Sequence, residues 1–188
     1  MHYRVALVTL LLTAASVLAN VLPSPIHTGG ELQPFTSNVV TGTFRGQQHC
    51  YVCSLVLNHP AVVVFSRQID GPTTRLVQHL DGFLHEHMKD NLVCWTVFLG
   101  AAGSDAEVAL EDRAYAFATG NHLDVLPITV LGDPQGPPGY RIPASVHVLA
   151  LITHGRRILQ SCSFDKAHWN NAAADTITAD IHRVLRLN

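Results

Sequence analysis

The chain has no concentration of positive charge. Its 188 residues include 12 lysines and arginines against 14 aspartates and glutamates, which gives a formal net charge of −2. The pair Arg156-Arg157 follows His154-Gly155, where a hairpin tip is expected. A nucleic-acid-binding surface needs clustered lysine and arginine, so we expect no nucleic-acid partner.

Apolar runs of membrane-spanning length are missing, and the N-terminal run has the three parts of a secretory signal. Met1–Arg4 is weakly basic, Val5–Leu18 is mostly apolar, and Val17 and Ala19 suit positions −3 and −1 of a cleavage site. The run is shorter than the about 20 apolar residues that a membrane span needs. We expect residues 1–19 to be a cleaved signal peptide, leaving no stable membrane span. The protein would then be periplasmic or extracellular; a retained anchor is the alternative.

Signatures of two catalytic classes are absent. No Gly-x-Ser-x-Gly motif occurs, so a hydrolase of the nucleophile-elbow type is not supported. No His-x-x-x-His occurs, and His85 and His87 would point about 200° apart around a helix. The 12 histidines are therefore interpreted as scattered surface residues, and we expect no resident cofactor or metal.

Composition divides the rest of the chain in two. Residues 20–34 are polar and rich in proline and glycine, which predicts a linker rather than core. From residue 35 onward, strand-like segments alternate with helix-like segments. Ala61–Phe65 is an unbroken apolar run, as expected of a strand covered on both faces. We expect one domain over residues 35–188, long enough to bury a sizeable core.

The order of these elements indicates the fold class. Strands that alternate with helices pair in parallel through right-handed crossovers, and a final hairpin adds antiparallel edge strands. The sequence therefore predicts an α/β domain, a three-layer α/β/α sandwich with a mixed sheet. The expected strands are 39–44, 61–65, 92–99, 126–131, 146–152 and 156–161, and the expected helices are 71–88, 104–120 and 177–185.

Cys50 and Cys53 form the strongest local motif, Cys50-Tyr51-Val52-Cys53. Two such thiols can close a small ring, and each can resolve a mixed disulfide formed by the other. His49 is close enough in sequence to stabilise a thiolate. The motif precedes the first core strand, and no helix is expected to begin at it. A static disulfide in an oxidising compartment is the plain alternative.

A metal site is a further alternative for the same motif. Cys50 and Cys53 would bind together with His49, and His59 would be a fourth ligand. Thiolate and imidazole ligands suit copper(I) or zinc. The other two cysteines stand apart from this motif: Cys94 lies inside an apolar strand and is expected in the core, and Cys162 ends a hairpin strand.

In layout the chain resembles the thioredoxin-like superfamily, especially the exported branch of peroxiredoxin-like and thiol-disulfide interchange proteins. The resemblance rests on the lead-in Val39–Gly46, the strand-helix-strand unit Ala61–Leu99, and the terminal hairpin Val146–Ser161 with its closing helix. Gly136–Tyr140 also looks like the region before the last two strands in peroxiredoxin-like chains. The resemblance implies a thioredoxin-like sandwich, in which Cys94 and Cys162 lie on strands too far apart to bond.

Two departures from the family pattern bear on function. The family carries its reactive cysteine just after the first core strand, but residues 66–74 of this chain contain none. The family also has a cis-proline directly before its hairpin strand. Here Pro143 lies twelve residues before Gly155 and Pro127 heads an earlier strand, so neither fits well. The usual active site is therefore expected to be absent.

These observations favour a divergent thiol-disulfide oxidoreductase that uses Cys50 and Cys53, with thiol- or disulfide-bearing proteins as partners. One sulfur would attack a partner's disulfide and the other would release it. A binding or structural module without catalysis is the rival, because the family's reactive position is empty. A copper- or zinc-handling protein is a third hypothesis, and a peroxidase is the least favoured.

Overall fold

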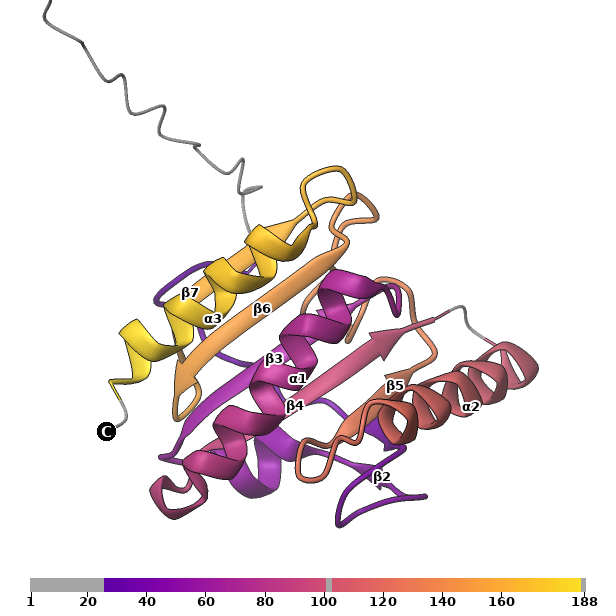
Figure 1. Cartoon of the computed structure of the whole chain (residues 1–188), viewed down its shortest axis with the longest axis horizontal. Helices are drawn as coiled ribbons and strands as arrows, with labels where there is room; N and C mark the ends of the chain where they lie inside the picture. The colour runs from indigo at the N-terminus through magenta and orange to yellow at the C-terminus, as the bar shows by residue number, and fades with distance from the viewer. Residues whose placement is uncertain (1–25, 101–102, 187–188) are drawn as a thin grey trace, which may run out of the picture.

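A computed structural model describes residues 26–100 and 103–186 of the chain. It contains a seven-stranded mixed sheet in the order β2-β1-β5-β4-β3-β6-β7 (Figure 1). The expected signal peptide, residues 1–19, lies outside the described residues. Among the helices that the structure describes, none is long and apolar enough to cross a membrane.

The centre of the sheet forms from the segments that the sequence predicts as buried strands. Strand β3 pairs in parallel with β4 and antiparallel with β6, while β4 pairs in parallel with β5. The predicted mixed sheet is therefore confirmed. The strands are β1 (Ser37–Val39), β2 (Gln48–His49), β3 (Pro60–Ser66), β4 (Val93–Leu99), β5 (Ile128–Leu131), β6 (Val148–His154) and β7 (Arg157–Phe164).

Strand β3 is covered on both faces, as its unbroken apolar run predicts. Val62 and Val64 point into one core, while Val63 and Phe65 point into the other. Alternate side chains of a strand face opposite sides, so a strand without polar positions needs a cover on each side. β3 therefore contributes side chains to both hydrophobic cores.

The three long helices, α1 (Gly71–Glu86), α2 (Ser104–Gly120) and α3 (Asn171–Leu185), cover one face of the sheet (Figure 1). The β3-α1-β4 and β4-α2-β5 crossovers advance in the same direction, so right-handed connections place both helices on one side. The opposite layer is built mainly from loops and the short π-helical segment η1 (Val52–Val56). A short 3₁₀ segment, η2 (Met88–Asp90), follows α1.

The expected linker differs from the structure in its described part, residues 26–34. The Gly29 amide donates to the Ile158 carbonyl at 2.8 Å, and the Leu32 amide donates to the Arg156 carbonyl at 2.7 Å. Leu32 itself is 0 % exposed and belongs to the core opposite the helices. Proline and glycine predicted irregular backbone correctly, but one leucine anchors this stretch to the domain.

The region after the linker also departs from expectation. The strand predicted at 39–44 is instead β1, Ser37–Val39, because the chain turns back from residue 41 to pair β2 with β1. Gly46 has a φ of +77°, a conformation that glycine adopts without strain, and its amide donates to the Val39 carbonyl at 2.8 Å. This hairpin brings the chain to Cys50.

Leu32→Ala tests whether the N-terminal stretch belongs to the core. We expect the free energy of unfolding to fall by about 2–5 kcal/mol, because the substitution leaves a cavity in a packed site. Urea denaturation measures this, with the exposed Thr36→Ala as control, for which a change under about 0.5 kcal/mol is expected. Equal, small effects of the two substitutions would show that residues 26–34 act as a linker after all.

Candidate functional site: a surface disulfide ahead of the central strand

The structure joins Cys50 and Cys53 in a disulfide bond with an S–S distance of 2.07 Å and a Cα–Cα distance of 5.3 Å. Cys53 is exposed, whereas Cys50 is half-buried. An attacking thiolate must approach a sulfur from solvent, so access differs between the two atoms. The geometry brings together the two residues that the sequence singles out, and it makes Cys53 the more accessible one.

A short helical turn begins at this motif, contrary to the expectation that no helix starts there. The Cys53 amide donates to the Cys50 carbonyl at 3.1 Å and lies 3.2 Å from the Cys50 sulfur, also as a donor. The Ser54 hydroxyl donates to the same carbonyl at 3.1 Å. The turn was not foreseen because Val52–Val56 is too short to show a helical period. Its consequence is an N–H aimed at the Cys50 sulfur.

Aromatic packing holds the motif against the sheet. Tyr51, between the two cysteines, is buried and stacks on Trp95 of β4 with ring centroids 5.4 Å apart. His49 stacks on Phe44 at 3.7 Å. Because the Tyr51 side chain has only two rotatable angles and is buried against Trp95, it restrains the backbone between the two cysteines. The motif is thus packed on the sheet through Tyr51, while Cys53 remains an exposed residue.

The His49 imidazole is directed at a serine hydroxyl. Its Nε2 lies 2.7 Å from the Ser54 hydroxyl, and partial burial lowers the pKa of the imidazole below its usual range. Among the described residues, no group of three or more histidines, cysteines, aspartates or glutamates could hold a metal ion. With the two sulfurs bonded to each other, the proposed ligand set with His59 gains no support from this geometry.

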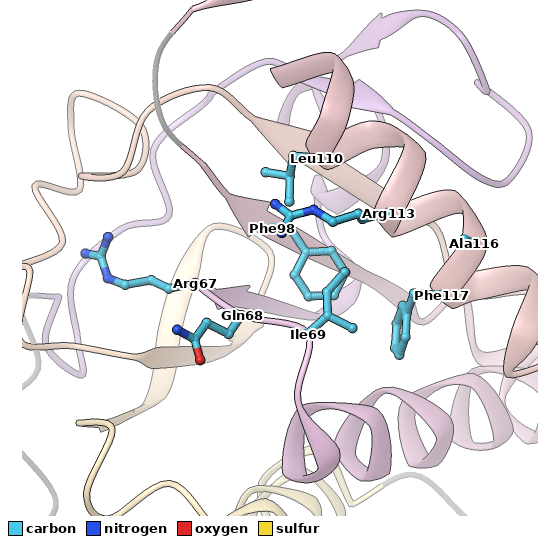
Figure 2. A pocket seen from close by; sticks show the side chains of 8 residues that line it. All are labelled: Arg67, Gln68, Ile69, Phe98, Leu110, Arg113, Ala116 and Phe117. Carbon is cyan, nitrogen blue, oxygen red and sulfur yellow. The ribbon is translucent and has the colours of Figure 1, made fainter. Parts of the chain in front are cut away.

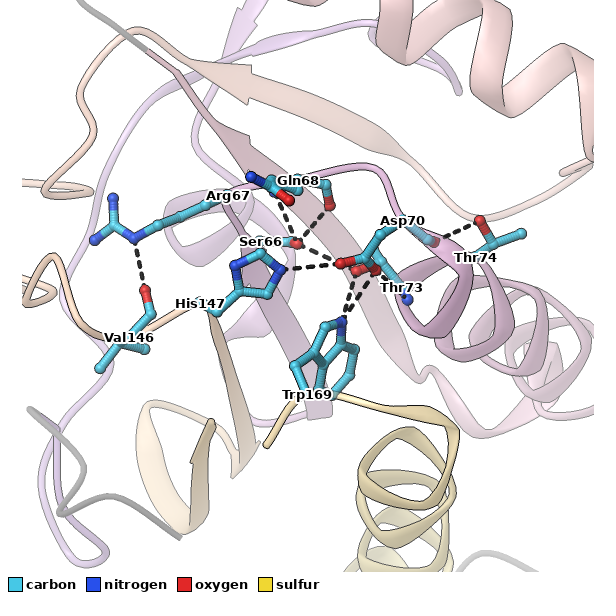
Figure 3. A network of polar contacts seen from close by, with 9 residues as sticks. All are labelled: Ser66, Arg67, Gln68, Asp70, Thr73, Thr74, Val146, His147 and Trp169. Carbon is cyan, nitrogen blue, oxygen red and sulfur yellow. Dashed lines mark hydrogen bonds and ion pairs between the residues drawn. The ribbon is translucent and has the colours of Figure 1, made fainter. Parts of the chain in front are cut away.

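A polar network occupies the position between β3 and α1 where the family carries its reactive cysteine (Figure 3). The Asp70 carboxylate contacts His147 Nε2 at 3.0 Å through Oδ2. Its Oδ1 accepts the Thr73 amide at 2.9 Å and the Trp169 indole N–H at 3.1 Å. One side chain therefore ties the first turn of α1 to the start of β6 and to the segment before α3.

The network keeps Asp70 charged. Burial by itself raises the pKa of this carboxyl, but the hydrogen bonds from Thr73, His147 and Trp169 outweigh it and lower the pKa below the ordinary value of 3.8. No local motif announces this network, since Asp70, His147 and Trp169 are far apart in the sequence. The one available signal is Asp70 before Gly71-Pro72, a pattern typical of a helix start, and Asp70 does cap α1.

The segment before β6 lacks the family's proline geometry. The residues directly before the strand are Val146 and His147, and no peptide bond of the described residues is cis. The Arg67 guanidinium instead holds this segment, donating to the carbonyls of Val146 at 2.6 Å and Pro143 at 2.9 Å. Arg67 and Asp70 thus tie the segment before β6 to the segment that follows β3.

The remaining cysteines are free and buried. Cys94 lies on β4 and Cys162 on β7, and β3 and β6 lie between these strands, so the two are too far apart to bond, as predicted. Burial raises the pKa of Cys162 to about 12 and also raises the pKa of Cys94. A protonated, inaccessible thiol is a poor nucleophile, so exchange chemistry at these two positions is disfavoured.

Comparison with solved structures identifies proteins of similar fold. No family model matches the chain, and no curated protein matches it. Among solved structures, a provisionally assigned protein disulfide isomerase from Bacteroides thetaiotaomicron superposes with a TM-score of 0.62 at 11% identity, covering 86% of this chain and 92% of that one. The peroxidoxin BcpB from Mycobacterium tuberculosis gives a TM-score of 0.57 at 15% identity, with 85% and 98% covered.

A provisionally assigned thiol:disulfide interchange protein, DsbE, from Chlorobium tepidum gives a TM-score of 0.54 at 13% identity, covering 83% of this chain and 99% of that one. These likenesses confirm the predicted thioredoxin-like fold. Identities this low show architecture alone. With the closed Cys50–Cys53 pair, the fold is compatible with a redox role.

Asp70→Ala tests the network that replaces the usual cysteine. At neutral pH we expect a loss of about 1–3 kcal/mol in the free energy of unfolding, because a helix cap and the bond to His147 disappear together. A carboxyl whose pKa is lowered by folding stabilises the protein above its unfolded pKa, and that stability is lost as pH falls through the folded pKa. The difference from wild type should therefore narrow as the pH is lowered from neutral to below the ordinary aspartate pKa of about 3.9.

Urea denaturation across this pH range measures the effect. Asp112→Ala, which removes an exposed carboxylate of α2, is the control and should change stability by less than about 0.5 kcal/mol throughout. A destabilisation by Asp70→Ala that is the same at every pH would contradict a charged Asp70 at the centre of the network.

Proposed function

We propose that this chain is an exported thiol-disulfide exchange protein whose reacting groups are Cys50 and Cys53. The observation that carries the proposal is the Cys50–Cys53 disulfide, in which Cys53 is an exposed residue and the intervening Tyr51 is packed on Trp95. The thioredoxin-like fold is compatible with such chemistry, although the disulfide stands before β3 rather than after it. Its partners would be proteins that carry accessible thiols or disulfides.

Different surroundings give the two sulfurs different roles. A partner's thiolate attacks the exposed Cys53 sulfur, and a bond forms between the two sulfurs. The Cys50–Cys53 bond breaks, and its electron pair passes to the Cys50 sulfur. Negative charge develops there, where the Cys53 amide donates at 3.2 Å, and a hydrogen bond to a charged acceptor is the stronger kind. Cys53 is the exchanging sulfur and Cys50 is the leaving one.

The second step completes the transfer of two electrons. Another thiolate of the partner attacks the partner's own sulfur in the mixed disulfide, and Cys53 leaves as a thiolate. The partner is oxidised to a disulfide, while this chain retains two thiols. In the reverse direction, the Cys53 thiolate attacks a partner's disulfide, and Cys50 then resolves the mixed disulfide. The same sulfur contacts the partner in both directions.

Export fits this chemistry. Residues 1–19 have the composition of a secretory signal, and disulfides persist in oxidising compartments such as the periplasm or the extracellular space. In such a compartment the pair would rest in its joined form and oxidise partner thiols.

Variants at the two cysteines test the exchange roles. In reduced Cys50→Ser, the remaining Cys53 thiolate should attack insulin disulfides and accumulate a mixed disulfide, because no neighbouring thiol can release it. Cys53→Ser should form about tenfold less of this species, because its remaining thiol is half-buried. Intact mass and non-reducing gels measure both, and Cys162→Ser serves as the control that leaves the wild-type exchange unchanged.

Catalysis of insulin reduction distinguishes an exchange-active Cys50–Cys53 pair from a structural disulfide. Wild type should speed insulin reduction by dithiothreitol, and both single cysteine variants should lose this acceleration. If wild type and Cys53→Ser reduce insulin at the same rate, the disulfide is structural, and the rival of a non-catalytic module replaces this proposal.

Processing of the N-terminus tests export. When the full chain is produced in a secreting bacterial host, the exported protein should have the mass of residues 20–188. Mass spectrometry of periplasmic and membrane fractions measures this. Recovery of the uncut chain in the membrane fraction would favour the retained anchor.

A further inference from the structure

A cavity of about 590 Å³ lies between α2 and the segment that links β3 to α1 (Figure 2). Its volume falls within the range of about 300–1,000 Å³ found for sites that bind small molecules. Phe98, at the end of β4, and Leu110 and Phe117, from α2, provide an apolar lining. Ile69 adds to this surface from the β3–α1 segment.

The charged groups of the lining have one sign. It holds two arginines, Arg67 and Arg113, and no acidic residue. The Arg67 guanidinium is directed away from the apolar side chains in Figure 2 and is bound to backbone carbonyls, Ile142 at 3.1 Å among them. The Arg113 side chain extends from α2 into the same lining as Phe98 and Leu110 (Figure 2). Within the part of the chain that the structure describes, the exposed side chain of Arg113 has no ion-pair or hydrogen-bond partner.

From this lining we infer that the cavity binds a small amphipathic anion, an aliphatic or aromatic carboxylate. The planar guanidinium of Arg113 can receive a carboxylate through two parallel hydrogen bonds. The apolar body would lie on Phe98, Leu110 and Phe117, which removes its surface from water. The Gln68 side chain, exposed at the same cavity, offers a further donor.

This site is separate from the disulfide. The cavity lies at the carboxyl ends of β3 and β4, on the face that the helices cover, where α/β sheets commonly bind ligands. Cys50 precedes β3 and packs with the core on the opposite face. The inference therefore does not depend on the proposed exchange chemistry, and carboxylate binding is expected whether the disulfide is joined or reduced.

Octanoate and octanol, which differ in the head group, provide the test on the full chain. In a ¹H–¹⁵N NMR titration, octanoate should shift the amide resonances of Gln68, Ile69 and Arg113 and bind at least about fivefold more tightly than octanol. Arg113→Gln should abolish this preference while octanol binding stays the same. Arg157→Gln, at an exposed arginine of β7, is the matched control and should keep the preference.

A second pair of variants tests the apolar part. Ala116 lines the cavity from the surface of α2, so Ala116→Trp should fill it and weaken both probes about tenfold. Val108→Trp places the same side chain on the exposed flank of α2 that faces away from the cavity lining and should change neither. Equal affinity for the two probes, shifts confined to other regions, or octanoate binding that Arg113→Gln and Ala116→Trp leave intact would overturn the inference.

Discussion

Burial of β3 on both faces is the constraint on which the rest of the structure depends. β4 and β6 flank the strand, and an apolar core covers each of its faces. The strand therefore has no solvent-facing positions for polar functional side chains. The polar and sulfur-containing groups described above lie at its two ends. The disulfide precedes Pro60, and the Asp70 network and the cavity follow Ser66. The disulfide and the Asp70 network with its cavity thus lie at opposite ends of one apolar strand.

The two ends of β3 carry different kinds of polar group. After the strand, Asp70 is held as a carboxylate by donors from three other residues, an arrangement that fastens elements together. Before the strand, Tyr51 on Trp95 gives the disulfide a rigid support, and Cys53 remains accessible. A polar network with a ligand-sized cavity beside it thus lies at one edge of the sheet, and the Cys50–Cys53 disulfide lies at the other.

Sequence patterns predict features formed by neighbouring residues, and they do not predict features formed by residues that only the fold brings together. The apolar runs at 61–65 and 92–99 identified β3 and β4, and the Cys50–Cys53 spacing identified a pair able to close. The composition of residues 20–34 predicts a linker, but composition does not reveal where one side chain packs, and Leu32 is buried. Asp70, His147 and Trp169 meet only after β3, β6 and α3 are in place, so no window of sequence contains the network. The cavity lining is likewise a product of the fold.

The reduction potential of the Cys50–Cys53 pair tests the central claim most directly. It is measured by equilibrating the protein with glutathione buffers and counting alkylated thiols by intact mass. The account predicts reversible interconversion with a midpoint between about −270 and −120 mV, the range of dithiol proteins that exchange with partners. A pair that stays joined down to potentials below about −300 mV would behave as a structural disulfide and would contradict the account.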